Sequence, residues 1–187
     1  MKIGISYYTA RGQSQRLRFV SRQRAYHGVN IGGTSLSGML NNRKAFGATL
    51  PYIAHMRHTH VSDHKFVRGQ PETGAELAED LQHIIDTYGA HTIAACFVEP
   101  LAGSTGVLVP PKGYLQRLRE ICDANGILLV FDEVICGFGR MGAEFGAQAF
   151  GVTPDIITMA KAITNGTQPM GAVAVRDDIY DTVVNAA

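Results

Sequence analysis

Two short apolar runs, each followed at once by a charged residue, most constrain what this chain can fold into. The first run spans residues 127–131 and precedes Asp132, and the second spans residues 156–160 and precedes Lys161. Both runs have the length of a buried strand. In an open α/β sheet, ligands bind in the crevice outside the carboxyl ends of the strands. The two runs therefore predict an acid and an amine at one ligand-binding edge, although an isolated strand-end charge more often simply meets solvent.

A third apolar run, at residues 92–98, is also ended by an acid, Glu99. Between it and the first run lies a helical pattern that Pro110 and Pro111 open and Gly126 ends. A strand, a helix and a strand over this length form a βαβ unit, whose two strands run parallel. We therefore expect an α/β fold with a mainly parallel sheet and helices on both faces.

Four further segments have recognisable patterns. Residues 2–11 have the apolar spacing of a helix, and residues 73–88 form an amphipathic helix that opens with a TGAE capping box. Residues 17–21 alternate polar and apolar side chains like an exposed strand, and residues 28–47 are rich in glycine, serine and asparagine, which indicates a loop or a short irregular helix. No internal repeat or linker divides the chain, so one domain, or most of one, is expected.

Two clusters of basic residues could suggest a phosphate-binding surface and a metal site, but neither is favoured. Five arginines lie between residues 11 and 24, but with a net charge of +1 a solvated face is favoured over a phosphate-binding surface. His55, His58, His60 and His64 could supply zinc ligands. Their spacing matches neither HExxH nor a Cys/His finger, so no metal site is expected.

The bulk composition excludes several classes of protein. A chain of 187 residues with 45% hydrophobic residues can bury a substantial core, and its near-neutral charge argues against a nucleic-acid binder. No apolar run reaches the roughly 18 to 20 residues that cross a bilayer, and no convincing signal peptide is present. Three cysteines without a CxxC pair suit reduced thiols in the cytoplasm. Cys136 follows Asp132 by four residues, but packing is its favoured role.

The acid and the amine match the needs of one cofactor. Pyridoxal phosphate is held by a lysine Schiff base, with a carboxylate opposite its pyridinium nitrogen. Side chains alternate faces along a strand, so only one of the neighbours Asp132 and Glu133 can face that ring.

Short motifs in the sequence support this match. FDEV, GFGR, PDIITMAK, TNG and PMGAV occur in this order, and the chain thereby resembles the class III pyridoxal phosphate aminotransferases. Within that class, YHG at residues 26–28 and VEPLAGSTGVLVPPKGYL from residue 98 are most similar to the β-alanine:pyruvate, or omega-amino acid:pyruvate, aminotransferases. The resemblance implies the large domain of the fold-type I transferases that use this cofactor.

The resemblance implies a role for each of five residues. Lys161 would form the Schiff base and act as the catalytic base, and Asp132 would face the ring nitrogen. Tyr26 would stack on one face of the ring, and Val134 would pack on the other. Glu99 would lie beside the ring oxygen and the lysine.

The resemblance also implies an activity and partners. The implied reaction transfers an amino group from an omega-amino acid or amine, such as β-alanine, to pyruvate with ping-pong kinetics. The alternatives are an aminomutase, a dialkylglycine-type decarboxylase or a catalytically inactive fragment. The full-length protein would be a homodimer or homotetramer. Residues 1–187 would be the cofactor-binding large domain, incomplete at both ends and without the small C-terminal domain, so that the 103–106 turn could offer at most a makeshift phosphate nest.

Overall fold

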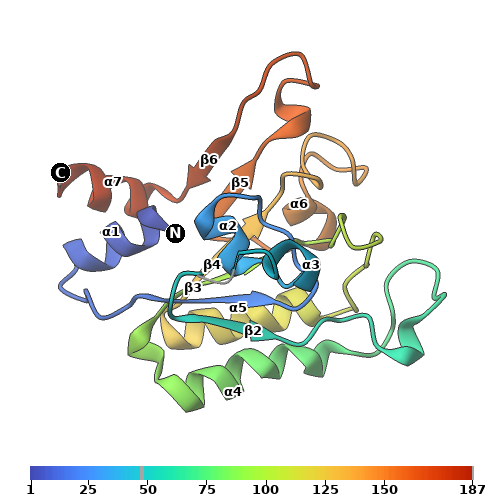
Figure 1. Cartoon of the computed structure of the whole chain (residues 1–187), viewed down its shortest axis with the longest axis horizontal. Coiled ribbons are helices and arrows are strands. Elements are labelled where there is room, and N and C mark those ends of the chain that lie inside the picture. The colour runs from blue at the N-terminus through green and yellow to red at the C-terminus, as the bar shows by residue number, and fades with distance from the viewer. Residues whose placement is uncertain (47–48, 187) are drawn as a thin grey trace.

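The computed structural model describes residues 1–46 and 49–186, which are built around one six-stranded sheet in the order β2-β1-β3-β4-β5-β6 (Figure 1). The first five strands in this order run parallel, and β6 pairs antiparallel with β5. The strands are β1 Arg18–Arg22, β2 Ile53–Met56, β3 Ile93–Val98, β4 Leu128–Asp132, β5 Ile156–Met159 and β6 Ala172–Val175. The expected mainly parallel sheet is therefore confirmed.

Helices cover both faces of the sheet (Figure 1). The α-helices are α1 Lys2–Ala10, α2 Ile31–Leu36, α3 Leu40–Arg43, α4 Glu79–Tyr88, α5 Tyr114–Asn125, α6 Gly146–Phe150 and α7 Asp177–Asn185. Short 3-10 turns span η1 Ser62–His64, η2 Ala75–Ala78, η3 Ala90–Thr92 and η4 Lys161–Ile163. No helix within the described residues is long and apolar enough to cross a membrane.

The alternation of side chains along the strands divides the core into two layers. Leu129 and Phe131 of β4 pack with helices α4 and α5 on one face. Leu128 and Val130 pack on the other face, together with α1 and α7. Because each central strand is buried on both faces, it reads as an unbroken apolar run, which is the pattern that the sequence shows at β3 and β4.

The prediction of an exposed strand at residues 17–21 is wrong. β1 lies between β2 and β3, and residues 19–22 are all buried. Its polar side chains have partners inside the protein: Ser21 contacts His27, and Arg22 donates to the carbonyl oxygen of Glu99. Alternation of polar and apolar residues indicates exposure only where the polar groups lack internal partners.

The arginines around β1 also differ from the expected solvated face. Arg11 and Arg24 are exposed, but Arg22 is only 3% exposed. The guanidinium carbon of Arg16 lies 4.7 Å from the ring centre of Tyr8, and that of Arg18 lies 3.6 Å from the ring centre of Tyr88. Stacking on aromatic rings lets these cations pack against the body of the protein.

The two long predicted helices begin later than expected. The segment at 73–88 opens with η2, and Thr73 makes no capping hydrogen bond, because the left-handed Gly74 (φ 117°) starts the turn instead. Helix α5 begins at Tyr114 after the left-handed Gly113, three residues beyond the proline pair, and ends at Gly126 as predicted. The role of Thr73 in the predicted capping box is therefore wrong, although the Glu76 carboxylate does accept from the Gly74 N–H at 3.2 Å. The helices themselves are confirmed.

The remaining segments agree in part with the sequence patterns. Helix α1 spans the expected residues, but Tyr7 and Tyr8 carry its buried stripe and Ala10 is exposed. The segment at 28–47 contains α2 and α3, and its last residue, Gly47, lies outside the described residues. The edge strands β2 and β6 were not predicted, because each is only four residues long and has few fully buried side chains.

Candidate active site

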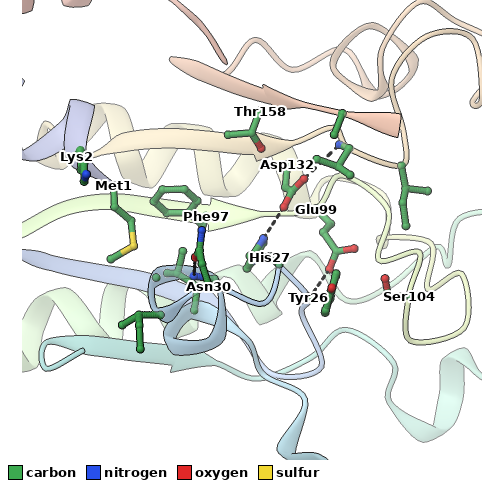
Figure 2. Close-up of a pocket in the computed structure, with 18 of the residues that line it drawn as sticks. Met1, Lys2, Tyr26, His27, Asn30, Phe97, Glu99, Ser104, Asp132 and Thr158 are labelled. Atoms are coloured by element: carbon green, nitrogen blue, oxygen red, sulfur yellow. Dashed lines mark hydrogen bonds and ion pairs between the residues drawn. The ribbon is translucent and has the colours of Figure 1, made fainter. Parts of the chain in front are cut away.

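A cavity of about 1020 Å³ lies at the carboxyl ends of β3, β4 and β5 (Figure 2). The segment after β1, helix α2 and the start of α1 complete its wall. All five residues that the sequence singled out line it: Tyr26, Glu99, Asp132, Val134 and Lys161. Residues that lie up to 135 positions apart in the chain thus meet where an open α/β sheet binds ligands.

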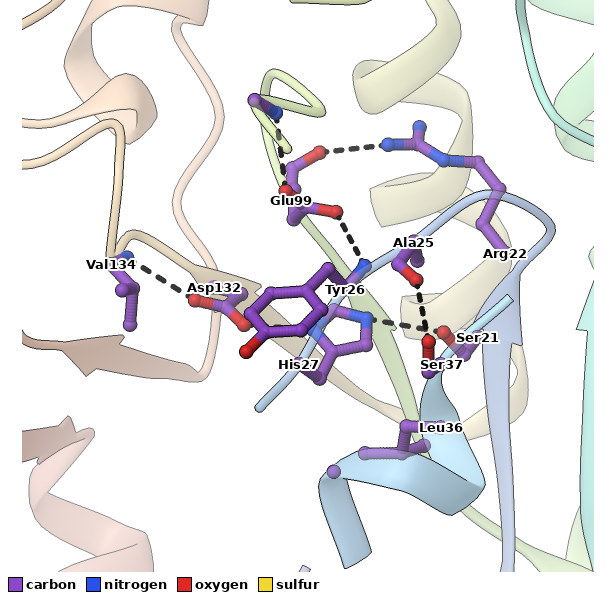
Figure 3. A network of polar contacts seen from close by, with 12 residues as sticks. Ser21, Arg22, Ala25, Tyr26, His27, Leu36, Ser37, Glu99, Asp132 and Val134 are labelled. Carbon is purple, nitrogen blue, oxygen red and sulfur yellow. Dashed lines mark hydrogen bonds and ion pairs between the residues drawn. The ribbon is translucent and has the colours of Figure 1, made fainter. Parts of the chain in front are cut away.

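Asp132 ends β4 and turns its carboxylate toward the cavity. Its Oδ2 lies 2.8 Å from Nδ1 of His27, and its Oδ1 accepts a hydrogen bond from the Val134 N–H at 3.2 Å (Figures 2 and 3). The Asp132 side chain is 11% exposed. It is therefore oriented on both oxygens and still accessible from the cavity.

Glu133 points to the opposite face, as strand alternation requires. It is fully buried and accepts hydrogen bonds from the N–H groups of Gly146 (2.9 Å) and Ala147 (2.7 Å) at the start of α6. Burial raises the pKa of the Glu133 carboxyl, and the two N–H donors act against that rise. Glu133 thus anchors the 134–145 loop, and it is not half of a catalytic pair.

His27 belongs to the site although sequence reasoning missed it. Its side chain is 4% exposed, its Nδ1 contacts Asp132, and its Nε2 lies 3.1 Å from the Ser21 hydroxyl. The ring also packs edge-on against Phe97, with 6.2 Å between ring centres. The available signal was its place directly after Tyr26, in a segment that follows a strand of the sheet.

Glu99 joins two walls of the cavity. Its Oε1 accepts a hydrogen bond from the Tyr26 N–H at 3.0 Å, and its Oε2 accepts one from the Gly103 N–H at 3.2 Å (Figure 3). Glu99 is 4% exposed, and burial raises the pKa of its carboxyl. The Tyr26 N–H, His27 and Arg22 lower that pKa, while Asp132 raises it.

Two N–H groups of the 103–106 turn, which could offer at most a makeshift phosphate nest, have partners inside the protein. The Gly103 N–H is committed to the Glu99 carboxylate, and the Gly106 N–H donates to the Gly103 carbonyl at 3.2 Å. A nest requires N–H groups that point at the anion without other partners. The turn also contributes Ser104 to the cavity wall.

Lys161 opens η4 just beyond β5 and has a left-handed backbone, with φ of 51°. For a side chain other than glycine this conformation costs about 1 kcal/mol. Ala160 before it is extended, so the chain turns sharply at the end of the strand. The exposed Lys161 side chain lines the cavity, and strain of this kind is typical of functional positions.

The other candidate side chains lie away from this chemistry. Cys136 is fully buried, its Sγ donates to the Leu101 carbonyl at 3.5 Å, and burial raises the pKa of its thiol to about 11. His64 is buried against the Thr59 carbonyl at 2.8 Å. Within residues 1–46 and 49–186, no group of three or more histidine, cysteine or acidic side chains could hold a metal ion.

Comparison with solved structures gives the same architecture. The omega-transaminase of Thermomicrobium roseum superposes with a TM-score of 0.91 at 40% identity, over 98% of this chain and 41% of that one. The omega-transaminase of Pseudomonas jessenii in complex with PMP also gives a TM-score of 0.91, at 35% identity, over 99% of this chain and 41% of that one. The fold is therefore the one that these two structures share with this chain over the matched residues.

Comparison of sequences defines the family. The chain matches the model of the class-III aminotransferases over residues 1–186, and it belongs to that family. It is 53% identical to the omega-aminotransferase of Caulobacter vibrioides, over 100% of this chain and 43% of that protein. It is 52% identical to the omega-amino acid–pyruvate aminotransferase of Pseudomonas putida, over 99% of this chain and 41% of that protein. The chain thus spans about two fifths of the length of these relatives.

Proposed function

We propose that this chain supplies the cofactor-binding large domain of an enzyme that uses pyridoxal phosphate to transfer an amino group from an omega-amino acid or amine, such as β-alanine, to pyruvate. The observation that carries the proposal is the delivery of an amine, Lys161, and an oriented carboxylate, Asp132, to one cavity. Membership of the class-III aminotransferases supports it. The names of the relatives favour transamination over the aminomutase and decarboxylase activities.

The residues of the cavity fit the pyridine ring of this cofactor. When bound, pyridoxal phosphate supplies an electron sink for the carbon that carries the amino group. Asp132 would hold a proton on the ring nitrogen, because an ionised carboxylate stabilises that positive charge. Tyr26 and Val134 would pack on the two faces of the ring, with Glu99 at its edge. The apolar wall beside them includes Phe97 and Ile135, which would exclude water from the ring.

The proposed work of Lys161 has two parts. Its amine would attach the cofactor, and once an incoming amine has displaced it, the free Nζ would be the base that moves a proton to and from the substrate carbon. The left-handed backbone fixes where the side chain leaves the end of β5, so the amine starts from one defined point on the cavity wall. A reaction in two halves predicts ping-pong kinetics.

We further propose that the full-length protein is a cytoplasmic homodimer or homotetramer. Large apolar side chains exposed in residues 29–40, a segment that contributes to the cavity wall, support an association through this region: Val29 is 83% exposed, Ile31 61% and Leu40 75%. Apolar groups in such numbers commonly mark an interface.

A titration of the purified chain with pyridoxal phosphate tests the proposal. We expect a visible absorption band of the bound cofactor, and after borohydride reduction a mass adduct on the peptide that contains Lys161. In a parallel experiment this chain replaces the matching 43% of the Caulobacter vibrioides relative, and the hybrid is assayed with β-alanine and pyruvate. A folded hybrid without a Lys161 adduct or without transamination would contradict the proposal.

A further inference from the structure

The two walls that Glu99 joins come from distant parts of the chain. The Tyr26 segment follows β1, and the Gly103 turn follows β3, yet both donate a backbone N–H to the same carboxylate. An ionised carboxylate accepts at both oxygens, whereas a protonated one turns one oxygen into a donor. The double contact therefore favours the charged form of Glu99, although burial favours the neutral form.

A buried cation contacts the main chain of Glu99. Arg22, the last residue of β1, is 3% exposed, and its Nη2 donates to the main-chain carbonyl oxygen of Glu99 at 3.1 Å (Figure 3). Its guanidinium carbon lies 5.7 Å from the ring centre of Tyr114. Among the described residues, Arg22 has no carboxylate within 4.0 Å, and its buried Nη1 has no hydrogen-bond partner.

An arrangement of this kind is unfavourable for folding alone. Burying a guanidinium without a paired acid costs free energy. An apolar side chain of similar volume would fill the space beside Tyr114 more cheaply. The position of the charge, next to the buried Glu99, offers a reason for its presence.

We infer that Arg22 is a positioning residue, whose buried positive charge keeps Glu99 ionised so that Glu99 holds Tyr26 and the Gly103 turn at the two sides of the cavity. Two other ionisable side chains act on the Glu99 carboxyl: His27, which lowers its pKa, and Asp132 at the end of β4, which raises it. Glu99 in turn raises the pKa of the Cys136 thiol. Only Arg22 combines a permanent charge with complete burial. The inference deepens the proposed function, and it rests on that function only for the identity of the ligand that Tyr26 contacts.

The first test uses the unaltered chain without cofactor. In a sample with isotope-labelled glutamate, NMR follows the δ-carbon shift of Glu99 and the amide shifts of Tyr26 and Gly103 as the pH is lowered. We expect all three signals to change with one common midpoint, because protonation of Glu99 breaks the double contact. Amide signals that do not follow the Glu99 carboxyl would overturn the inference.

The second test separates the charge of Arg22 from its packing. In Arg22→Met, which retains most of the volume, the Glu99 midpoint should rise by about one pH unit. Arg22→Lys, which keeps the charge, should leave the midpoint close to that of the unaltered chain. Arg57→Met serves as the control, because Arg57 pairs with Asp80 on the surface. Equal midpoints in Arg22→Met and the unaltered chain would show that Arg22 only fills space.

A third measurement links the inference to ligand binding. Pyridoxal phosphate should bind about tenfold more weakly to Arg22→Met than to the unaltered chain, and Arg22→Lys should recover most of that loss. If the unaltered chain binds no cofactor, the proposed function fails while the Glu99 titration still decides the inference. If cofactor binds but the titration is unchanged by Arg22→Met, the inference fails and the proposed function stands.

Discussion

The two ends of the parallel sheet both bury carboxylates, but they hold them differently. At the amino ends of the strands, Asp155 is 4% exposed and forms ion pairs with Arg119 (2.9 Å) and Arg176 (2.6 Å). Its Oδ2 also accepts the Leu129 N–H at 2.6 Å. At the carboxyl ends, Asp132 is held within the described residues by His27 and one backbone N–H.

The difference indicates what each end does. Asp155 joins β4, α5 and the start of α7 through two arginines and a backbone N–H, so its charge is paired within the protein. Asp132 is oriented by its neighbours but is not neutralised by an arginine or a lysine within the described residues. A carboxylate that is fixed in place and open to a cavity can meet a positive charge that arrives with a ligand.

The largest effect is expected at the carboxyl end from Lys161→Ala. This variant should lose the cofactor adduct at position 161, and the hybrid enzyme should lose transamination, because the other amines on the described cavity wall, those of Met1 and Lys2, lie at the start of α1 and not at the end of β5. Lys112→Ala is the matched control, since Lys112 pairs with Glu72 on the surface. Absorption spectra and mass mapping measure the result, and a Lys161→Ala hybrid with near-normal turnover would refute the assignment.

At the amino end, Asp155→Ala should lower the free energy of unfolding by about 3 kcal/mol, because it leaves Arg119 and Arg176 without their buried partner. Urea denaturation measures this change, and Asp63→Ala, at an exposed position, is the control. Cofactor affinity should be unchanged at temperatures where the variant is folded. A loss of unfolding free energy below about 1 kcal/mol would show that Asp155 is not the structural ion-pair partner that distinguishes the amino end from the carboxyl end.

Asp132→Asn should instead have a small effect on stability and a large effect on turnover. The amide keeps the shape of the side chain and a contact with His27, so the free energy of unfolding should change by less than about 1 kcal/mol. Turnover of the hybrid should fall about a hundredfold, because a neutral amide does not stabilise charge on the ring. Steady-state kinetics measure the change in turnover, and urea denaturation measures the change in stability. A stability loss as large as that of Asp155→Ala would mean that Asp132 is mainly structural.

The smallest effect is expected at Tyr8, close to the amino end. Its hydroxyl donates to the Gly126 carbonyl at 2.6 Å, and burial raises its pKa from 10.0 to about 12. A pKa that is higher in the folded state stabilises the protein below pH 10.0, and this contribution disappears as the pH rises from 10.0 to about 12. Tyr8→Phe should cost about 1 kcal/mol near neutral pH and flatten this alkaline dependence, as urea denaturation at several pH values can show.

Tyr180→Phe is the control for this prediction, because Tyr180 is 60% exposed. It should leave both the stability and its alkaline dependence unchanged. If Tyr8→Phe behaves in the same way as Tyr180→Phe, the hydroxyl of Tyr8 adds nothing to the structural role of the amino end.

The sequence by itself determined the strands that carry the site. Apolar runs ended by Glu99, Asp132 and Lys161 predicted three strand ends at one edge of the sheet, because burial on both faces demands unbroken apolar stretches. The two-residue period of a strand also separated Asp132 from Glu133 correctly. These features depend on local chemistry, which a single stretch of sequence contains.

The tertiary structure alone decided how those ends are held. Residues 17–21 resembled an exposed strand, yet the strand order places β1 inside the sheet, and that order buries Arg22 behind Glu99. The contact between His27 and Asp132 joins residues 105 positions apart. Such contacts follow from the packing of the whole chain, since the free energy of burying a polar group depends on neighbours that a local sequence pattern does not specify.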